Sequence, residues 1–246
     1  MTSGRLWRRQ SILVYLRSMV DVALLELEGV LFDTMDLQRA GLRDALIPLG
    51  ILLPLDSDVI DGLPPRAAAI AALSLGRIDV DDVLLDVIAT RAERAFSERL
   101  AAAGAGLRAG ARSFVEDAAS QARIAIVTRA SRSDAESMLR LAELESMATV
   151  MICADYVLEA KPSPDGHRMA LERLARQRPF GRTAVLALED GLLGIRAARA
   201  AGARCVAVGP MPAHVALEAD AYTASLEGQS LRSLDALSVP GPERVQ

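Results

Sequence analysis

The sequence predicts an α/β protein: a three-layer core with a mostly parallel sheet, and an α-helical cap inserted after the first strand. Two patterns predict this fold. Short aliphatic runs, typical of strands buried on both faces of a sheet, alternate with longer helical patterns along most of the chain. The gap after the first run, about seventy residues long, has no strand pattern. The 246 residues, 51% of them hydrophobic, suffice for one sizeable core with an insert.

The core elements follow from these patterns in chain order. Strands are expected in the runs rich in Val, Ile, Leu and Ala at 22–27, 124–128, 149–153, 184–188 and 205–208. Helices with apolar residues at helical spacing are expected at 110–121, 133–144, 164–176 and 192–201. Parallel strands are joined by right-handed crossovers, so these helices should cover both faces of the sheet.

The long gap is expected to form the cap, at 36–104. Its helical patterns lie at 37–49, 64–75 and 80–103. Three glycines, Gly104, Gly106 and Gly110, mark the return to the core and suit a hinge. The core then consists of 19–35 and 105–237.

The two ends of the chain differ from the core. Residues 1–18 contain four arginines, no acidic residue and an apolar cluster at 12–16. A basic amphipathic segment of this kind is typical of a helix that docks on a membrane surface or a protein partner. The other interpretation is a start of translation at Met19, just before the first strand. The Pro- and Gly-containing tail, 238–246, is expected to be flexible.

Composition excludes several classes of protein. Aromatic residues make up 3% of the chain and the formal net charge is −4, so binding to nucleic acid is not expected. No apolar run reaches the roughly 18–20 residues that span a bilayer. Cys153 and Cys205 lie in apolar runs without metal-ligand spacing, as expected for buried, reduced thiols of a cytoplasmic protein. It would be peripheral to a membrane or complex if the N-terminal segment docks.

One lysine stands out among the basic residues. Of the 28 lysines and arginines, 27 are arginine, and the exception is Lys161. An isolated lysine in such a chain is either chance or a position where a compact ammonium is needed and a planar guanidinium does not fit.

Carboxylates follow the predicted strands at the edge where ligands bind in open parallel sheets. Glu26 and Glu28 end the first strand, and Glu189 and Asp190 follow the fourth. Four carboxylates in one crevice need a cation, and Mg²⁺ would suit Glu26, the Glu28 carbonyl and Asp190. A hydroxyl and an ammonium, Thr128 and Lys161, follow the second and third strands and suit a phosphate.

Together these segments resemble the haloacid dehalogenase superfamily, in its β-phosphoglucomutase and phosphoglycolate-phosphatase-like branch. The family's first motif begins Asp-x-Asp-Gly, and residues 26–29 here read Glu-Leu-Glu-Gly. Its second is a strand ending in Ser or Thr, as at Thr128, and its third is Lys-Pro-x-Pro, as at 161–164. The fourth, Glu-Asp-Ser, is matched by 189–191 with glycine in place of serine. The lone lysine falls on the family's lysine position.

The resemblance implies a Rossmann-like core, a helical cap in this place and the strand order 5-4-1-2-3. It also implies roles: Glu26 would attack phosphorus, and Glu28 would protonate the leaving oxygen and then deprotonate water. Thr128 and Lys161 would hold the phosphoryl oxygens. Mg²⁺ would bind at Glu26, Glu28, Glu189 and Asp190, and the substrate would be a small phosphorylated metabolite.

Both family aspartates are glutamates here, and each adds one methylene. A displacement of about 1 Å at a reacting group can lower a rate roughly a hundredfold. The first hypothesis is therefore a protein that keeps the Mg²⁺ and phosphate pocket, hardly turns over, and serves as a binding, regulatory or structural component. The alternative is an active phosphatase or phosphomutase. A dehalogenase needs no metal, so the Glu189–Asp190 pair counts against it.

Three further side chains carry weaker signals. His167, on the helix after the lysine motif, is expected to be a solvated or packing histidine. Arg66 in the cap is expected to lie on the surface, although it could reach a substrate. Arg129, directly after Thr128, is ambiguous between a surface and a site role.

Overall fold

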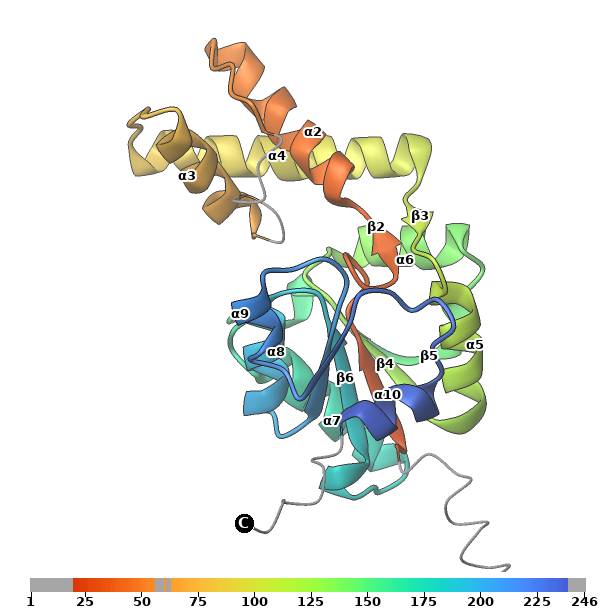
Figure 1. The fold of residues 1–246 in the computed structure, drawn as a ribbon. Helices are drawn as coiled ribbons and strands as arrows, with labels where there is room; N and C mark the ends of the chain where they lie inside the picture. The colour runs from red at the N-terminus through yellow and green to blue at the C-terminus, as the bar shows by residue number, and fades with distance from the viewer. Residues whose placement is uncertain (1–19, 56–59, 61–62, 239–246) are drawn as a thin grey trace, which may run out of the picture.

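The computed structural model describes residues 20–55, 60 and 63–238 (Figure 1). Its main sheet has six parallel strands in the order β5-β4-β1-β6-β7-β8. The strands are β1 (Val22–Leu25), β4 (Arg123–Val127), β5 (Ala148–Ile152), β6 (Val185–Glu189), β7 (Arg204–Val208) and β8 (Ala221–Thr223). The expected order of the first five is confirmed. The sixth, β8, was missed because it is three residues long and lacks a buried pattern.

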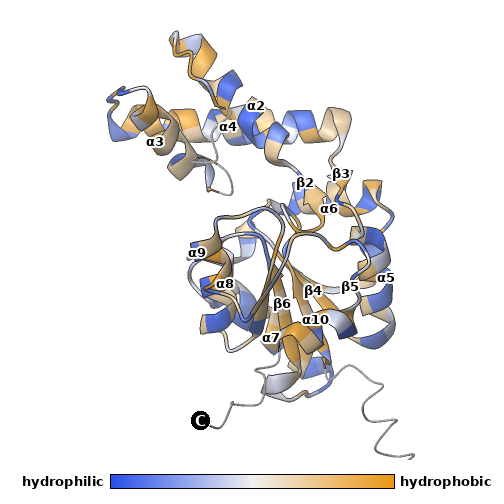
Figure 2. Cartoon of the chain, in the orientation of Figure 1, coloured by the Kyte–Doolittle hydropathy of each residue, from blue (hydrophilic) through white to orange (hydrophobic). Residues whose placement is uncertain are grey.

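The central strand β1 shows why the sheet is covered on both faces. All four of its residues are buried. Successive side chains point to opposite faces, so Val22 and Leu24 join one apolar cluster while Ala23 and Leu25 join the other. Figure 2 shows the same hydrophobic character in the strands beneath the helices. A core strand with no polar face is what a parallel sheet between two helical layers requires.

Helices form the outer two layers. One cluster contains buried residues of α5 (Ala111–Gln121), α6 (Arg132–Leu141) and α10 (Leu231–Ser238). The other contains residues of α7 (Asp165–Gln177), α8 (Leu192–Ala200) and α9 (Ala213–Ala216). The α/β class with three layers is therefore confirmed. Short 3₁₀ turns connect the elements at η2 (Glu145–Met147), η3 (Ala154–Tyr156) and η4 (Arg182–Ala184).

The helical insert follows the first strand, as expected, and lies above the core in Figure 1. It consists of α2 (Met35–Leu46), η1 (Ile47–Leu49), α3 (Pro65–Leu75) and α4 (Asp82–Ala103). These helices share an apolar cluster of their own. Gly41 allows α2 and α4 to approach closely, since a Cβ there would lie 2.7 Å from the carbonyl oxygen of Ala92.

Two short strands connect the insert to the core. β2 (Phe32–Asp33) and β3 (Gly106–Leu107) pair antiparallel, so the chain leaves and re-enters the core side by side. The sequence marked Gly106 as part of a hinge but did not predict this pairing, because two-residue strands carry no periodicity. Gly104, with φ of 70°, ends α4 in a conformation that favours glycine.

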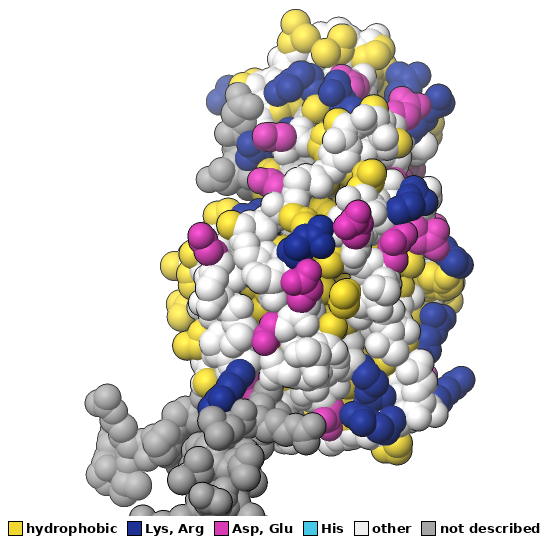
Figure 3. All heavy atoms as spheres, turned by 90° about the vertical axis from the view of Figure 1, so that its right-hand side faces the viewer, with side chains coloured by type: hydrophobic (Ala, Val, Ile, Leu, Met, Phe, Trp, Pro, Cys, Tyr) yellow, Lys and Arg dark blue, Asp and Glu magenta, His cyan; other side chains and the backbone are white. Residues whose placement is uncertain are grey.

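At the C-terminal end, the described part of the chain closes with the helix α10. Ser238, which the sequence analysis placed in the tail, is the last residue of α10 and is buried, and its hydroxyl accepts a hydrogen bond from Arg204. The predictions for residues 1–18, Met19 and the rest of the tail lie outside the described residues. Within the described part of the chain, no helix combines the length and apolar character that crossing a membrane requires. On the face in Figure 3, acidic and basic side chains of the described residues are interspersed.

Candidate functional site

The predicted site residues lie at one edge of the sheet, where β1 is flanked by β4 and β6. Leu25 is opposite Ile126 on one side and Leu188 on the other. Glu26 directly follows Leu25, and Glu189 follows Leu188 as the last residue of β6, so the two glutamates lie next to one another. This edge is also where the strand order reverses, the usual position of ligand sites in such sheets.

Lys161 holds the centre of the cluster. Its Nζ donates hydrogen bonds to Glu26 Oε2 at 2.6 Å, to the carboxylate of Glu189 at 2.8 Å and to the carbonyl oxygen of Val127 at 3.0 Å. An ammonium has three hydrogens, so each is directed at a protein partner. Burial alone would lower the pKa of Lys161, but the carboxylates of Glu189 and Glu26 outweigh it and raise that pKa. The lone lysine thus lies where a compact ammonium contacts three strand ends, as expected if its place in the sequence is not due to chance.

Glu26 is held at both of its carboxylate oxygens. Oε2 accepts the hydrogen bond from Lys161, and Oε1 accepts one from the backbone N–H of Leu27 at 2.8 Å. The Glu26 residue is 1% exposed. The carboxylate thus folds back against its own strand end and is fixed there.

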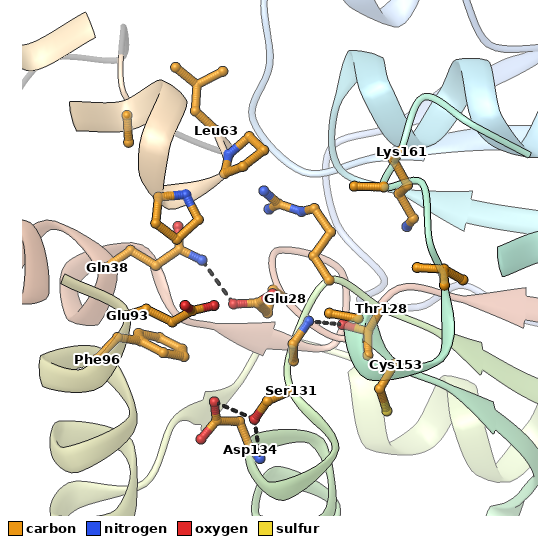
Figure 4. A pocket seen from close by; sticks show the side chains of 18 of the residues that line it. Glu28, Gln38, Leu63, Glu93, Phe96, Thr128, Ser131, Asp134, Cys153 and Lys161 are labelled. Carbon is orange, nitrogen blue, oxygen red and sulfur yellow. Dashed lines mark hydrogen bonds between the residues drawn. The ribbon is translucent and has the colours of Figure 1, made fainter. Parts of the chain in front are cut away.

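Glu28 faces the cap. Its Oε1 accepts a hydrogen bond from Nε2 of Gln38 on α2 at 3.0 Å (Figure 4). Burial raises the pKa of Glu28, and the nearby Arg129 guanidinium opposes that rise without cancelling it. The two glutamates of the first motif therefore have different partners, one in the core and one in the cap.

His167 has a place in the site that the sequence did not reveal. It is 1% exposed, and its Nε2 lies 2.9 Å from Glu189 Oε1. Of the two expected alternatives, a solvated or a packing histidine, the burial excludes the solvated one. Burial would raise the pKa of Glu189, but Lys161 and His167 together hold it below its usual value. The helical spacing around His167 could have indicated its buried face, but not its partner 22 residues away.

Asp190 is the least anchored carboxylate of the four. It accepts no hydrogen bond from the described residues, and it packs so closely on Gly29 that a Cβ there would lie 2.0 Å from Asp190 Oδ2. Burial raises the pKa of Asp190 to about 7, with Arg129 acting in the opposite direction. Asp190 therefore keeps its proton to a higher pH than a solvent-exposed aspartate does.

The chemistry of these oxygens suits Mg²⁺, but their arrangement does not form a ready-made metal site. In the part of the chain that the structure describes, no three His, Cys, Asp or Glu side chains converge as metal ligands do. Glu26 and Glu189 instead direct their oxygens at Lys161. The four carboxylates do not fit a pre-formed Mg²⁺ site in this arrangement.

Thr128 and Arg129 lie at the end of β4 and retain unused hydrogen-bond donors. Oγ1 of the buried Thr128 accepts a hydrogen bond from the Ala130 N–H at 3.2 Å, which leaves the hydroxyl hydrogen available. Arg129 forms no hydrogen bond with the described residues. Burial opposes its charge, yet Glu28 and Asp190 raise the pKa of Arg129, so the guanidinium stays charged beside the carboxylates.

A cavity of about 270 Å³ lies between the core and the cap. Its core wall includes Glu28, Thr128, Arg129 and Lys161, and its cap wall comes from α2, α3, α4 and the described residues just before α3. Cys153 also lines the cavity. Both Cys153 and Cys205 are free and buried. Arg66 does not line the cavity and instead pairs with Asp82 and Asp86 on the cap surface. The cavity is where a ligand would meet both domains.

The Rossmann-like core, the inserted helical cap and the cavity between them define a capped, Rossmann-like α/β fold. The chain belongs to the haloacid dehalogenase-like hydrolase family, whose sequence profile matches residues 26–208.

Among curated relatives, the chain is similar to Protein CbbY of Cereibacter sphaeroides, with 29% identity over 198 residues, 76% of this chain and 84% of that protein. It is also similar to a phosphorylated carbohydrates phosphatase of Thermotoga maritima, with 28% identity over 189 residues, 74% of this chain and 82% of that protein. The crystal structure of CbbY from Rhodobacter sphaeroides in complex with phosphate superimposes with a TM-score of 0.72 and 25% identity, covering 88% and 99% of the two chains.

Proposed function

We propose that this protein binds a small phosphorylated metabolite in the cavity between core and cap and hydrolyses it slowly or not at all. In this role it is a binding, regulatory or structural component built on a hydrolase fold. Support for the ligand class comes from the relatives, one of which is a phosphatase of phosphorylated carbohydrates and another a protein crystallised with phosphate.

The observation that carries the proposal is the position of Glu26. By resemblance, this residue occupies the place of the family's nucleophilic aspartate and is one methylene longer. Its two oxygens accept hydrogen bonds from Lys161 and the Leu27 N–H. Attack on phosphorus would require the carboxylate to leave these partners and to reach an in-line position, and an error of about 1 Å there costs roughly a hundredfold in rate.

Phosphate would be held by the donors that remain available. The Thr128 hydroxyl and the Arg129 guanidinium meet this condition, and both line the cavity. A guanidinium matches two phosphate oxygens at once. Lys161, whose three hydrogens are directed at protein oxygens, would supply positive charge behind the site. Its direct contact with phosphate stays a prediction.

Binding of Mg²⁺ likewise stays a prediction. Its support is Asp190, a half-buried carboxylate with a raised pKa and no hydrogen bond from the described residues. Because Glu26 and Glu189 are paired with Lys161, we expect Mg²⁺ to bind weakly in the absence of phosphate.

One observation favours the alternative, an active Mg²⁺-dependent phosphomonoesterase or phosphomutase. Burial raises the pKa of Glu28, and a carboxylic acid that keeps its proton nearer neutral pH suits the general acid of phosphoester cleavage. Turnover would then depend on how far Glu26 can move.

Two measurements on the native protein decide between these functions. Isothermal titration with inorganic phosphate, with and without Mg²⁺, reports binding. Phosphate release from a panel of sugar and glycolyl phosphates reports turnover. Binding without release is the expected result, whereas rapid release from any phosphomonoester would establish the alternative. If inorganic phosphate does not bind, the proposal that this cavity holds a phosphate is wrong.

A further inference from the structure

The cap wall of the cavity is made mainly of apolar side chains. Leu42 of α2 and Phe96 of α4 are 3% and 8% exposed, and Leu63 and Pro64 complete the wall before α3. Figure 4 shows Leu63 and Phe96 on the cap side, with Thr128 and Lys161 on the core side. A ligand that fills the cavity would therefore place its phosphate at the core and its organic group against this apolar wall.

Among the described residues, the cap side of the cavity offers few polar groups for a sugar. Gln38 already donates to Glu28 at 3.0 Å and to Thr34 at 3.3 Å. Arg39 lies 4.0 Å from Asp36. The hydroxyls of a sugar would thus be buried with few partners, which costs binding free energy.

Charged side chains of both signs line the cap end of the cavity. Glu93 projects from α4 and, like Glu28, lines the cavity (Figure 4), and Arg39 of α2 lines the same wall. The carboxylate and the guanidinium carry opposite charges, so charge at this end does not by itself select the ligand. The apolar surface of the wall carries the selection.

We propose that the cavity selects a phosphate monoester whose organic group is an apolar ring or short chain, rather than a polyhydroxylated sugar. This inference rests on the proposed phosphate binding. The phosphate meets Thr128 and Arg129, and the organic group packs on Leu42, Leu63 and Phe96.

The test uses two esters of matched ring size. Cyclohexyl phosphate and glucose 1-phosphate both carry a six-membered ring, and glucose adds a ring oxygen, hydroxyls and a hydroxymethyl group. Isothermal titration of the native protein should give a dissociation constant for cyclohexyl phosphate about tenfold or more below that for glucose 1-phosphate, because the apolar ring leaves water. Inorganic phosphate, titrated in parallel, reports the phosphate site alone.

A pair of cap variants locates the effect. Leu63→Gln should weaken cyclohexyl phosphate binding several-fold and leave inorganic phosphate binding unchanged. Leu52→Gln is the control, since Leu52 is on the cap surface, 79% exposed and outside this cavity, and should change neither. Tighter binding of glucose 1-phosphate, or equal binding of both esters, would overturn the inference while the phosphate site stands. Failure of inorganic phosphate and both esters to bind would overturn the inference together with the proposed function.

Discussion

Nζ of Lys161 lies 2.6 Å from Oε2 of Glu26, across 135 residues of chain. Lys161 is the one lysine of the chain, and by resemblance Glu26 takes the place of the family's nucleophile. The two side chains are hydrogen-bonded to each other. The same ammonium contacts Glu189 and the carbonyl of Val127, so it joins the ends of β1, β4 and β6. The ammonium thus links the three strand ends and restrains the Glu26 carboxylate through a hydrogen bond.

Removal of the ammonium should strongly destabilise the fold. Lys161→Met would leave Glu26 and Glu189 buried without their cation, and loss of one partner of a buried ion pair typically costs about 3–5 kcal/mol. We expect a loss of this order in the free energy of unfolding, measured by urea denaturation. Arg94→Met is the control, because Arg94 and Glu98 form an exposed pair that should contribute little to stability. Equal effects of the two substitutions would contradict this account of Lys161.

A glycine behind Glu189 offers a test that leaves all charges in place. A Cβ at Gly194 would lie 1.9 Å from Glu189 Oε2, whereas a Cβ at Gly191 would meet nothing within 4 Å. Gly194→Ala should displace the carboxylate from Lys161 and His167 and lower the free energy of unfolding by about 2 kcal/mol, the usual scale for disrupting a buried hydrogen-bonded charge. Gly191→Ala should change it by less than about 0.5 kcal/mol. Thermal unfolding of both variants checks this, and a Gly194→Ala variant as stable as Gly191→Ala would refute the packing argument.

Stability should fall as pH rises through the range in which Asp190 titrates. Burial raises the pKa of Asp190 to about 7, while an unfolded aspartate ionises near 3.9. Between these values the folded state keeps a proton that the unfolded chain has lost, so higher pH favours unfolding through this group. Asp190→Asn removes the effect.

The variant should therefore be more stable than the native protein at pH 8, by on the order of 2 kcal/mol after allowance for partial exposure, and the difference should shrink at pH 5. Urea titrations at the two pH values measure it. A stability difference that is independent of pH would show that Asp190 ionises normally.

The two thiols should be inert in the folded protein. Burial raises the pKa of Cys153 to about 12 and raises that of Cys205 as well, so neither forms the reactive thiolate near neutral pH. Ellman's reagent at pH 8 should label neither thiol in the native protein within minutes and both in urea. Rapid labelling of either thiol in the folded state would contradict the burial of that cysteine.

Much of this fold could be predicted from the sequence because buried parallel strands and amphipathic helices have distinct apolar patterns. For most strands, the observed first or last residue differs from the expected one by one or two positions. The helix expected at 133–144 ends at Leu141, since Glu143 adopts a positive φ of 54°. Such a conformation has no signal in the periodicity.

The site could be located but its contacts could not be predicted. Strand ends and family motifs placed Glu26, Thr128 and Asp190 at one edge. The sequence did not show that Lys161 pairs with two carboxylates, or that His167 faces Glu189, because both depend on how α7 and its preceding loop pack on the sheet. Partners this distant in the chain are set by tertiary packing and not by local pattern.

The central claim is that the length and fixed position of Glu26 limit turnover. The most direct test compares steady-state phosphate release, with Mg²⁺, from the native protein and the Glu26→Asp, Glu28→Asp double variant, using a phosphate ester that both bind. The account predicts that the double variant releases phosphate at least about a hundredfold faster, since shortening both carboxylates restores the family's geometry. A native protein that already turns over as fast as the double variant would contradict it.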